Sequence, residues 1–196
     1  MIQLPEAKKE RLAALLFQRS YESRQVTLAS GKQSDFYLDC KQTTLHPEGL
    51  YLAGRFFLDA IRSGDGKDGT KKVMAVGGPT LGSDPLAAAC AVLSHLDGAP
   101  VHAFIIRKEP KGHGTRAWVE GAKHLEAGTR VAIVEDVVTT GGSSIKAADR
   151  AKEAGLEVAK IVCLVDREEG GAEAVRAAGY EFEAILTIRE VRRASA

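Results

Sequence analysis

Short apolar runs alternate with helical patterns along the last two thirds of this chain. Each run is short enough for a buried strand: residues 73–76, 101–106, 131–134, 161–165 and 182–188. Between most of the runs, apolar residues recur at helical spacing, as over 85–96 and 145–154. Buried strands that alternate with helices favour a parallel sheet covered on both faces. The pattern therefore predicts an α/β fold with a central parallel sheet flanked by helices.

The first 70 or so residues have a different pattern. Their apolar spacing and their prolines predict two helices, over 5–19 and 47–61, and two short strands, over 26–28 and 36–38. The strands would lie on either side of a turn at residues 30–32. A stretch rich in Gly and Asp, residues 63–69, is the clearest break in the sequence and is predicted to be a loop.

Composition places the chain among ordinary globular proteins. Of its 196 residues 44% are hydrophobic and 27% are charged, and the net charge of +1 offers no general attraction to nucleic acid or to a membrane surface. No apolar run approaches membrane-spanning length, and the first six residues lack the regions of a signal peptide. Cys40, Cys90 and Cys163 form neither a metal-ligand spacing nor a disulfide framework. We therefore expect a cytoplasmic protein with no nucleic-acid or membrane partner.

The most informative chemistry follows the third apolar run. Glu135 and Asp136 end that run, a Thr- and Gly-rich loop follows over 139–144, and a helical pattern begins after it. Backbone N–H groups and hydroxyls at a helix N-terminus suit an anion, and Gly141 and Gly142 let the backbone approach it. The carboxylates repel phosphate but accept hydrogen bonds from sugar hydroxyls, or bind a divalent cation. The run predicts a ribose 5-phosphate site; the alternative is an ordinary strand-to-helix turn with an Asp cap.

A long polar insertion, about residues 108–128, separates the second and third runs. Loops of this size inside a compact domain are usually functional or mobile. Basic and potentially basic side chains gather at its start, among glycines: Arg107, Lys108, Lys111 and His113. Such a run is often only a solvated surface. Next to a phosphate site, it would instead supply cations to a pyrophosphate leaving group.

The acid pair and its loop closely resemble the motif with which type I phosphoribosyltransferases bind 5-phosphoribosyl 1-pyrophosphate (PRPP). Strand, acid pair, Thr/Gly loop and helix occur in the required order. The basic run resembles the catalytic loop of the orotate phosphoribosyltransferases, as do Asp166-Arg167 after the fourth apolar run and Phe36-Tyr37 after Ser30-Gly31. Purine phosphoribosyltransferases share the acid pair but usually lack the basic run, so this run carries the substrate assignment.

The resemblance implies the type I phosphoribosyltransferase fold, with a small hood from the N-terminal segment. We expect one phosphoribosyltransferase domain over 1–196. The helices and hood strands would occupy about 1–70, and the α/β core about 71–190, with a mobile loop at 108–120. The activity implied is transfer of phosphoribosyl from PRPP to orotate, giving orotidine 5'-monophosphate in de novo pyrimidine (UMP) biosynthesis. Mg²⁺ would be the cofactor, held mainly by PRPP and water. A homodimer is implied, in which each loop closes over the partner subunit's site.

The roles of individual residues also follow from the resemblance. Lys111 and Asp136 would be catalytic. PRPP would be bound by Arg107, Lys108, Lys111, His113, Glu135, Asp136, Val137, Val138, Thr139, Thr140, Gly141, Gly142 and Ser143. Arg167 would pair with the orotate carboxylate, and Thr139 would lie near orotate. The alternative for Arg167 is a surface residue paired with Asp166 or Glu168.

Two positions depart from the family pattern. Many members carry lysine where Ala29 and Leu81 stand; Lys32 or Lys41 are candidates to replace one of these lysines.

Two other functions compete with transfer to orotate. The first is transfer of phosphoribosyl to another base. The second is a PRPP-sensing regulator that binds nucleic acid, which the near-neutral charge and short length disfavour.

Overall fold

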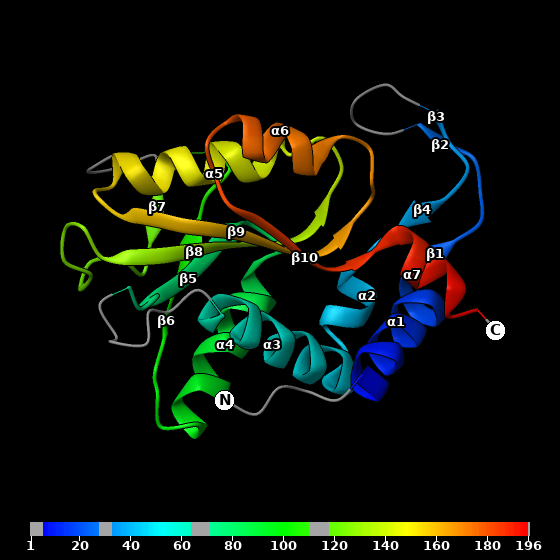
Figure 1. Ribbon diagram of the computed structural model, residues 1–196, viewed down its shortest axis with the longest axis horizontal. Helices are drawn as coiled ribbons and strands as arrows, with labels where there is room; N and C mark the ends of the chain where they lie inside the picture. Colours follow the sequence, from blue (N-terminus) through cyan, green and yellow to red (C-terminus); the bar gives the residue numbers. More distant parts are fainter. Residues whose placement is uncertain (1–5, 28–32, 64–70, 110–117, 196) are drawn as a thin grey trace.

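The protein is described here by a computed structural model, which covers residues 6–27, 33–63, 71–109 and 118–195 (Figure 1). Its central sheet has six strands in the order β10-β9-β8-β5-β6-β7. In chain order these are β5 (Ala75–Pro79), β6 (His102–Ile106), β7 (Val119–Glu120), β8 (Arg130–Val138), β9 (Glu157–Asp166) and β10 (Phe182–Thr187). Every neighbouring pair is parallel except β6 and β7. The predicted parallel sheet is confirmed, with one short antiparallel edge strand added.

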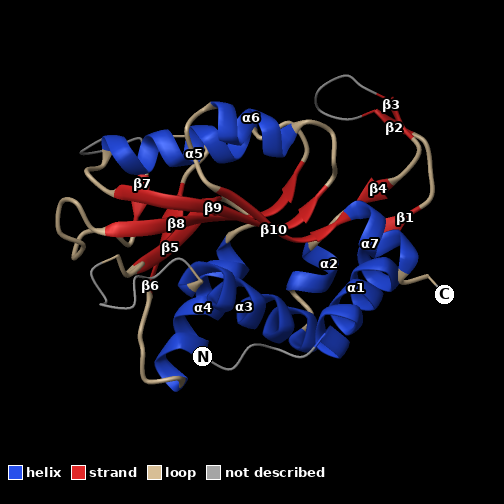
Figure 2. Cartoon of the chain, in the orientation of Figure 1, coloured by secondary structure: helices blue, strands red, loops and turns tan. Residues whose placement is uncertain are grey.

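Helices cover both faces of this sheet (Figure 2). On one face lie α5 (Gly142–Glu153) and α6 (Gly171–Ala177). The other face carries α3 (Pro47–Arg62) and α4 (Asp84–Leu96), with α1 (Glu6–Ser20), α2 (Lys41–Thr44) and α7 (Ile188–Arg193) grouped beside them. The sequence predicted α1, α3, α4 and α5. It missed the other three, which have four to seven residues and too few apolar positions for a helical period.

The strand that leads to the acid pair is buried on both faces. Val131 and Ile133 of β8 pack into the core under α5 and α6, whereas Ala132 and Val134 pack into the core under α3 and α4. Side chains of a strand alternate between the two faces, so a strand covered on both sides must be apolar throughout. This burial explains the unbroken apolar run, and it holds Glu135 in a fixed position at the end of that run.

The N-terminal segment forms two short antiparallel strand pairs, one nested inside the other along the chain. β1 (Tyr21–Glu22) pairs with β4 (Tyr37–Leu38), and β2 (Val26–Thr27) pairs with β3 (Gln33–Ser34). The expectation that the 26–28 and 36–38 strands flank a single turn is therefore wrong in its pairing. Tyr21 stacks on Phe36 with ring centroids 5.6 Å apart, which holds β4 beside β1. The predicted turn at 30–32 and most of the predicted loop at 63–69 lie outside the described residues.

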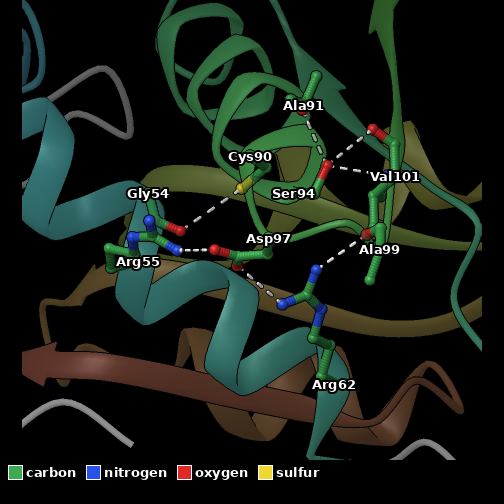
Figure 3. Close-up of polar contacts among 9 residues, drawn as sticks. All are labelled: Gly54, Arg55, Arg62, Cys90, Ala91, Ser94, Asp97, Ala99 and Val101. Carbon is green, nitrogen blue, oxygen red and sulfur yellow. Dashed lines mark hydrogen bonds and ion pairs between the residues drawn. The ribbon is translucent and has the colours of Figure 1, made fainter. Parts of the chain in front are cut away.

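Polar contacts lock α3 to the end of α4 (Figure 3). Asp97 accepts hydrogen bonds from Arg55 at 2.6 Å and from Arg62 at 3.1 Å, and Arg62 also donates to the Ala99 carbonyl. Gly54 lets the helices approach closely, because a Cβ there would lie 2.8 Å from Leu93. These contacts fix α3 against the C-terminal part of α4.

Two expectations about the whole chain meet direct observations. Cys40, Cys90 and Cys163 are all free and buried. Among the helices that the structure describes, none is long and apolar enough to cross a membrane.

Candidate active site

Charged side chains from several elements gather where strands β5, β6 and β8 end. A cavity of about 630 Å³ opens there, lined by Lys41, residues 79–82, Arg107, Lys108, residues 135–137, and Ser143, Lys146 and Arg150 of α5. The carboxyl ends of parallel strands are where α/β proteins bind ligands. A smaller cavity of about 420 Å³ between α1 and α7 contains none of these segments. The charged cavity is therefore the candidate active site.

Glu135 points from the end of β8 to the first turn of α5. Its side-chain oxygen Oε2 accepts hydrogen bonds from Ser143 Oγ at 3.2 Å and from Ser144 Oγ at 3.0 Å, and the residue is only 5% exposed. Burial, reinforced by the charge of Asp136, raises the pKa of Glu135 to about 8. This carboxyl group therefore ties the strand to the start of the helix, a contact that the sequence did not indicate.

Asp136 faces the loop that follows β5. Its Oδ1 accepts a hydrogen bond from the Val137 backbone N–H at 2.9 Å. A Cβ on Gly82 would lie 2.4 Å from the Asp136 carboxyl group, so the loop rests directly on this side chain and needs glycine there. Burial raises the pKa of Asp136, and the positive charge of Lys41 partly offsets that rise. The structure thus brings Asp136, Gly82 and Lys41 to one part of the cavity.

The Thr/Gly loop turns sharply into α5. Gly141 has a φ of 79° and is the N-cap residue, with no side-chain cap on the helix. A Cβ on Gly141 would lie 2.9 Å from the Gly171 carbonyl, whereas a Cβ on Gly142 would meet nothing within 4 Å. Gly141 is thus needed for the turn and for packing against α6, and Gly142 leaves room for a ligand. Thr139 is half-buried and Thr140 exposed, at an open helix N-terminus of the kind that binds anions.

The basic insertion begins and ends beside this cavity. Arg107 and Lys108 line it, and the backbone N–H of Arg107 donates to the Trp118 carbonyl at 2.9 Å. The guanidinium of Arg150 lies 3.7 Å from the centre of the Trp118 ring and donates to the Arg107 carbonyl at 2.7 Å. Trp118 therefore anchors the return of the insertion. Lys111 and His113 lie outside the described residues.

Arg167 lies next to the Thr/Gly loop, and its guanidinium already forms an ion pair with Glu169. Its backbone N–H donates to the Val138 carbonyl at 2.9 Å, so it follows β9 at the predicted edge. Its guanidinium donates to Glu169 at 2.8 Å and to Ser34 Oγ at 3.0 Å, and it lies over the Phe36 ring at 4.2 Å. The side chain is 4% exposed, so it is neither a surface residue nor paired with Asp166 or Glu168.

Two further cations that the sequence did not single out also line the cavity. Lys146 and Arg150 share one face of α5 with Ser143, at spacings of three and seven residues. Counting helical positions onward from the predicted phosphate loop would have found them. Lys41, which the sequence offered as a replacement for a family lysine, also lines this cavity.

Comparison with known proteins agrees with this fold. The phosphoribosyl transferase domain family matches residues 42–180. Orotate phosphoribosyltransferase from Sorangium cellulosum is 47% identical over 94% of this chain and 93% of its own length. The enzyme of that name from a Nostoc species is 43% identical over 94% of this chain and 85% of its own length. The structure of the Mycobacterium tuberculosis orotate phosphoribosyltransferase in complex with PRPP has a TM-score of 0.73, with 32% identity over 94% of this chain and 99% of that one.

The fold, the acid pair and the matched family define a phosphoribosyl transferase domain. The relatives that are more than 40% identical over nearly the whole chain are orotate phosphoribosyltransferases. This chain belongs to the orotate phosphoribosyltransferase family, and so to the pentosyltransferases.

Proposed function

We propose that the cavity at the carboxyl ends of the strands binds PRPP and that this chain transfers the phosphoribosyl group to orotate. The products would be orotidine 5'-monophosphate and pyrophosphate, in de novo pyrimidine biosynthesis. One observation carries the proposal: the acid pair, Ser143 in the first turn of α5 and a group of cations line the same cavity. The relatives' names and the PRPP complex of the Mycobacterium tuberculosis enzyme support it.

Three parts of the site would bind the 5'-phosphate, the ribose and the pyrophosphate of PRPP. The 5'-phosphate would bind the loop from Thr139 to Ser143, where backbone N–H groups are free of a side-chain cap. The ribose hydroxyls would bind Asp136, with Glu135 behind it holding the loop through its two serine contacts. Val137 and Val138 would complete the loop wall. The pyrophosphate would face Arg107 and Lys108, joined by Lys111 and His113 of the insertion.

The chemistry follows from charge. The bond between ribose C1 and the pyrophosphate oxygen breaks, and a ring nitrogen of orotate forms a bond to the same carbon. The proton that this nitrogen loses passes to the released pyrophosphate or to solvent. In the transition state the sugar ring gains positive charge and the pyrophosphate gains negative charge. Fixed cations such as Arg107 and Lys111 would stabilise the leaving group most at that point, while Asp136 would hold the ribose in place. The insertion, once closed, would exclude water that would otherwise hydrolyse PRPP. No side-chain nucleophile is required.

Orotate would lie between the phosphate loop and the N-terminal segment. Thr139 and Arg167 are the proposed contacts, with Arg167 pairing with the ring carboxylate, a planar group suited to guanidinium. The half-buried Ser34 and the Phe36 ring already hold that guanidinium in place. Binding of orotate would require the carboxylate to share Arg167 with Glu169, or to displace it.

Mg²⁺ fits a site in which the substrate supplies most ligands. Among the residues that the structure describes, no three His, Cys, Asp or Glu side chains group as a metal centre. The cavity lining combines the carboxyl groups of Glu135 and Asp136 with several cations. We propose that PRPP and water would hold most of the coordination of Mg²⁺, which would supply positive charge to the leaving group.

The proposed working form is a cytoplasmic homodimer. The insertion leaves the sheet at Arg107 and returns at Trp118, beside the site, and would close over the partner subunit's cavity. Three free, buried cysteines agree with a reducing compartment.

A base-exchange assay tests the function. The purified chain is given PRPP, Mg²⁺ and, in turn, orotate, uracil, hypoxanthine or adenine, and pyrophosphate release is measured. We expect release with orotate and at least a hundredfold less with the others, which lack the ring carboxylate. Preference for uracil or a purine would support transfer to another base, and PRPP binding without any turnover would support a regulator.

A further inference from the structure

One cation in the cavity comes from the N-terminal segment. Lys41 is the first residue of α2 and lines the cavity together with the 79–82 loop and Asp136. The other described cations of the cavity all come from the α/β core: Arg107, Lys108, Lys146 and Arg150. Lys41 is therefore the one described cation of the cavity that the α/β core does not supply.

The contacts of Lys41 hold its ammonium group in a defined place. Nζ lies 2.6 Å from Asp39 Oδ1, and the lysine side chain is 42% exposed while that of Asp39 is 17% exposed. An ammonium group has three N–H donors, and the described structure pairs Nζ with Asp39 alone. The group can keep Asp39 and still donate to a ligand in the cavity. The hydrogen bond to Asp39 and the charge of Asp136 both raise the pKa of Lys41, so it stays charged.

The part of the ligand that Lys41 meets follows from its neighbours. Lys41 and Gly82 both approach Asp136, and Lys41 lines the cavity together with the whole 79–82 loop. That loop presents Leu81, an exposed apolar side chain, and no cation of its own. A diphosphate lying along the loop needs a cation from elsewhere.

We propose that Lys41 is a further pyrophosphate-binding residue, whose ammonium group binds the diphosphate of PRPP and the pyrophosphate released from it. The identity of the diphosphate as a leaving group rests on the function proposed above. The charge complementarity between Lys41 and a diphosphate in this cavity does not. In the ground state Asp39 orients the lysine, and in the transition state the lysine shares the growing negative charge with Arg107 and Lys108.

Calorimetric titration with two probes tests the proposal. Inorganic pyrophosphate with Mg²⁺ reports the diphosphate position, and ribose 5-phosphate reports the Thr/Gly loop. Lys41→Ala should weaken pyrophosphate binding at least tenfold and leave ribose 5-phosphate binding within twofold. It should also raise the KM for PRPP. Lys41→Arg should recover most of the pyrophosphate affinity, because it restores the charge.

A matched control separates charge near the site from charge in general. Lys123 is an exposed lysine in the turn after β7, outside the cavity lining, and Lys123→Ala should change neither titration. Unchanged pyrophosphate binding in Lys41→Ala would overturn the proposal, as would an equal loss for both probes, which would mark a structural role. Failure of the wild type to use orotate would refute the proposed function and leave this pyrophosphate result standing.

Discussion

Glu135 and Asp136 are adjacent carboxylic acids, yet their side chains meet different partners. Glu135 turns into the protein and accepts hydrogen bonds from two serine hydroxyls of α5, while Asp136 turns towards the 79–82 loop and the cavity. Alternation along the strand accounts for the difference, because successive side chains point to opposite faces. The resemblance assigned both residues to ribose hydroxyls. The geometry supports that role more directly for Asp136 and gives Glu135 the role of holding the phosphate loop.

Glu135 should make stability depend on pH in one direction. Its pKa is about 8 in the folded chain, against an ordinary value near 4.3 when unfolded. Between about pH 5 and 7.5 the folded state keeps a proton that the unfolded state releases. The free energy of unfolding should therefore fall as pH rises, by up to about 1.4 kcal/mol per pH unit from this group. Below about pH 4 the contribution is fully present.

Denaturant unfolding at several pH values, for wild type and Glu135→Gln, measures this effect. Glutamine keeps the shape and can still accept from a serine hydroxyl, so the variant should lack the slope and gain stability relative to wild type towards pH 8. Parallel curves for the two proteins would show that Glu135 is ionised in the folded state.

Arg167 should determine orotate affinity. Arg167→Ala is expected to weaken orotate binding by roughly 1.5–3 kcal/mol, the range for a hydrogen bond to a charged group, and to change PRPP affinity little. Glu169→Gln is the matched control, since it removes the other partner of the ion pair seen at 2.8 Å. If Glu169→Gln reproduces the orotate loss in full, the effect of Arg167→Ala reflects the broken ion pair rather than a contact with substrate.

Among the elements, the longer strands and helices could be predicted, whereas the strand pairing within the N-terminal segment could not. Apolar runs such as 131–134 and 161–165 identified β8 and β9, because burial on both faces leaves a clear signal. Strands of two residues, such as β1 and β7, carry no periodicity at all. Their pairing depends on contacts distant in sequence, such as Tyr21 with Phe36. The acid pair was found for its chemistry, but its two partners, Ser144 and Gly82, appear only when the chain is folded.

The loop after β5 should be intolerant of any side chain at Gly82. A Cβ there would approach the Asp136 carboxyl group to 2.4 Å, so either the loop or the carboxylate must move. Gly82→Ala should lower kcat/KM for PRPP on the order of a hundredfold, the usual cost of displacing a reacting group by about 1 Å. Thermal unfolding monitors the fold. Normal kinetics in a stable variant would show that the loop does not set the position of Asp136.

At the scale of the whole molecule, one edge of the sheet collects segments that are far apart in sequence. Lys41, the 79–82 loop, Arg107 and the end of β8 reach the same cavity because parallel strands end together. The sequence could predict this convergence from the strand order of an α/β fold. It offered Lys41 only as one of two candidates to replace a family lysine, because nothing in the sequence fixes where the N-terminal segment lies relative to the sheet.

Shared sites in a dimer would show in mixtures of inactive subunits. Lys111→Ala and Asp136→Asn should each lower turnover by a hundredfold or more, through loss of a leaving-group cation and of a ribose contact. Heterodimers of the two variants should recover up to about half of the wild-type activity per dimer, because one hybrid site contains both native residues. No recovery in purified heterodimers would mean that each insertion serves its own subunit.

The rate of PRPP-dependent orotate consumption shows whether the cavity beside the acid pair transfers phosphoribosyl to orotate. Wild type and Asp136→Asn are compared at saturating PRPP and Mg²⁺, with thermal unfolding to establish that both are folded. We predict that wild type consumes one orotate for each pyrophosphate released, and that Asp136→Asn is slower by at least about a hundredfold. A folded Asp136→Asn enzyme as fast as wild type would show that the cavity beside the acid pair is not the site of phosphoribosyl transfer.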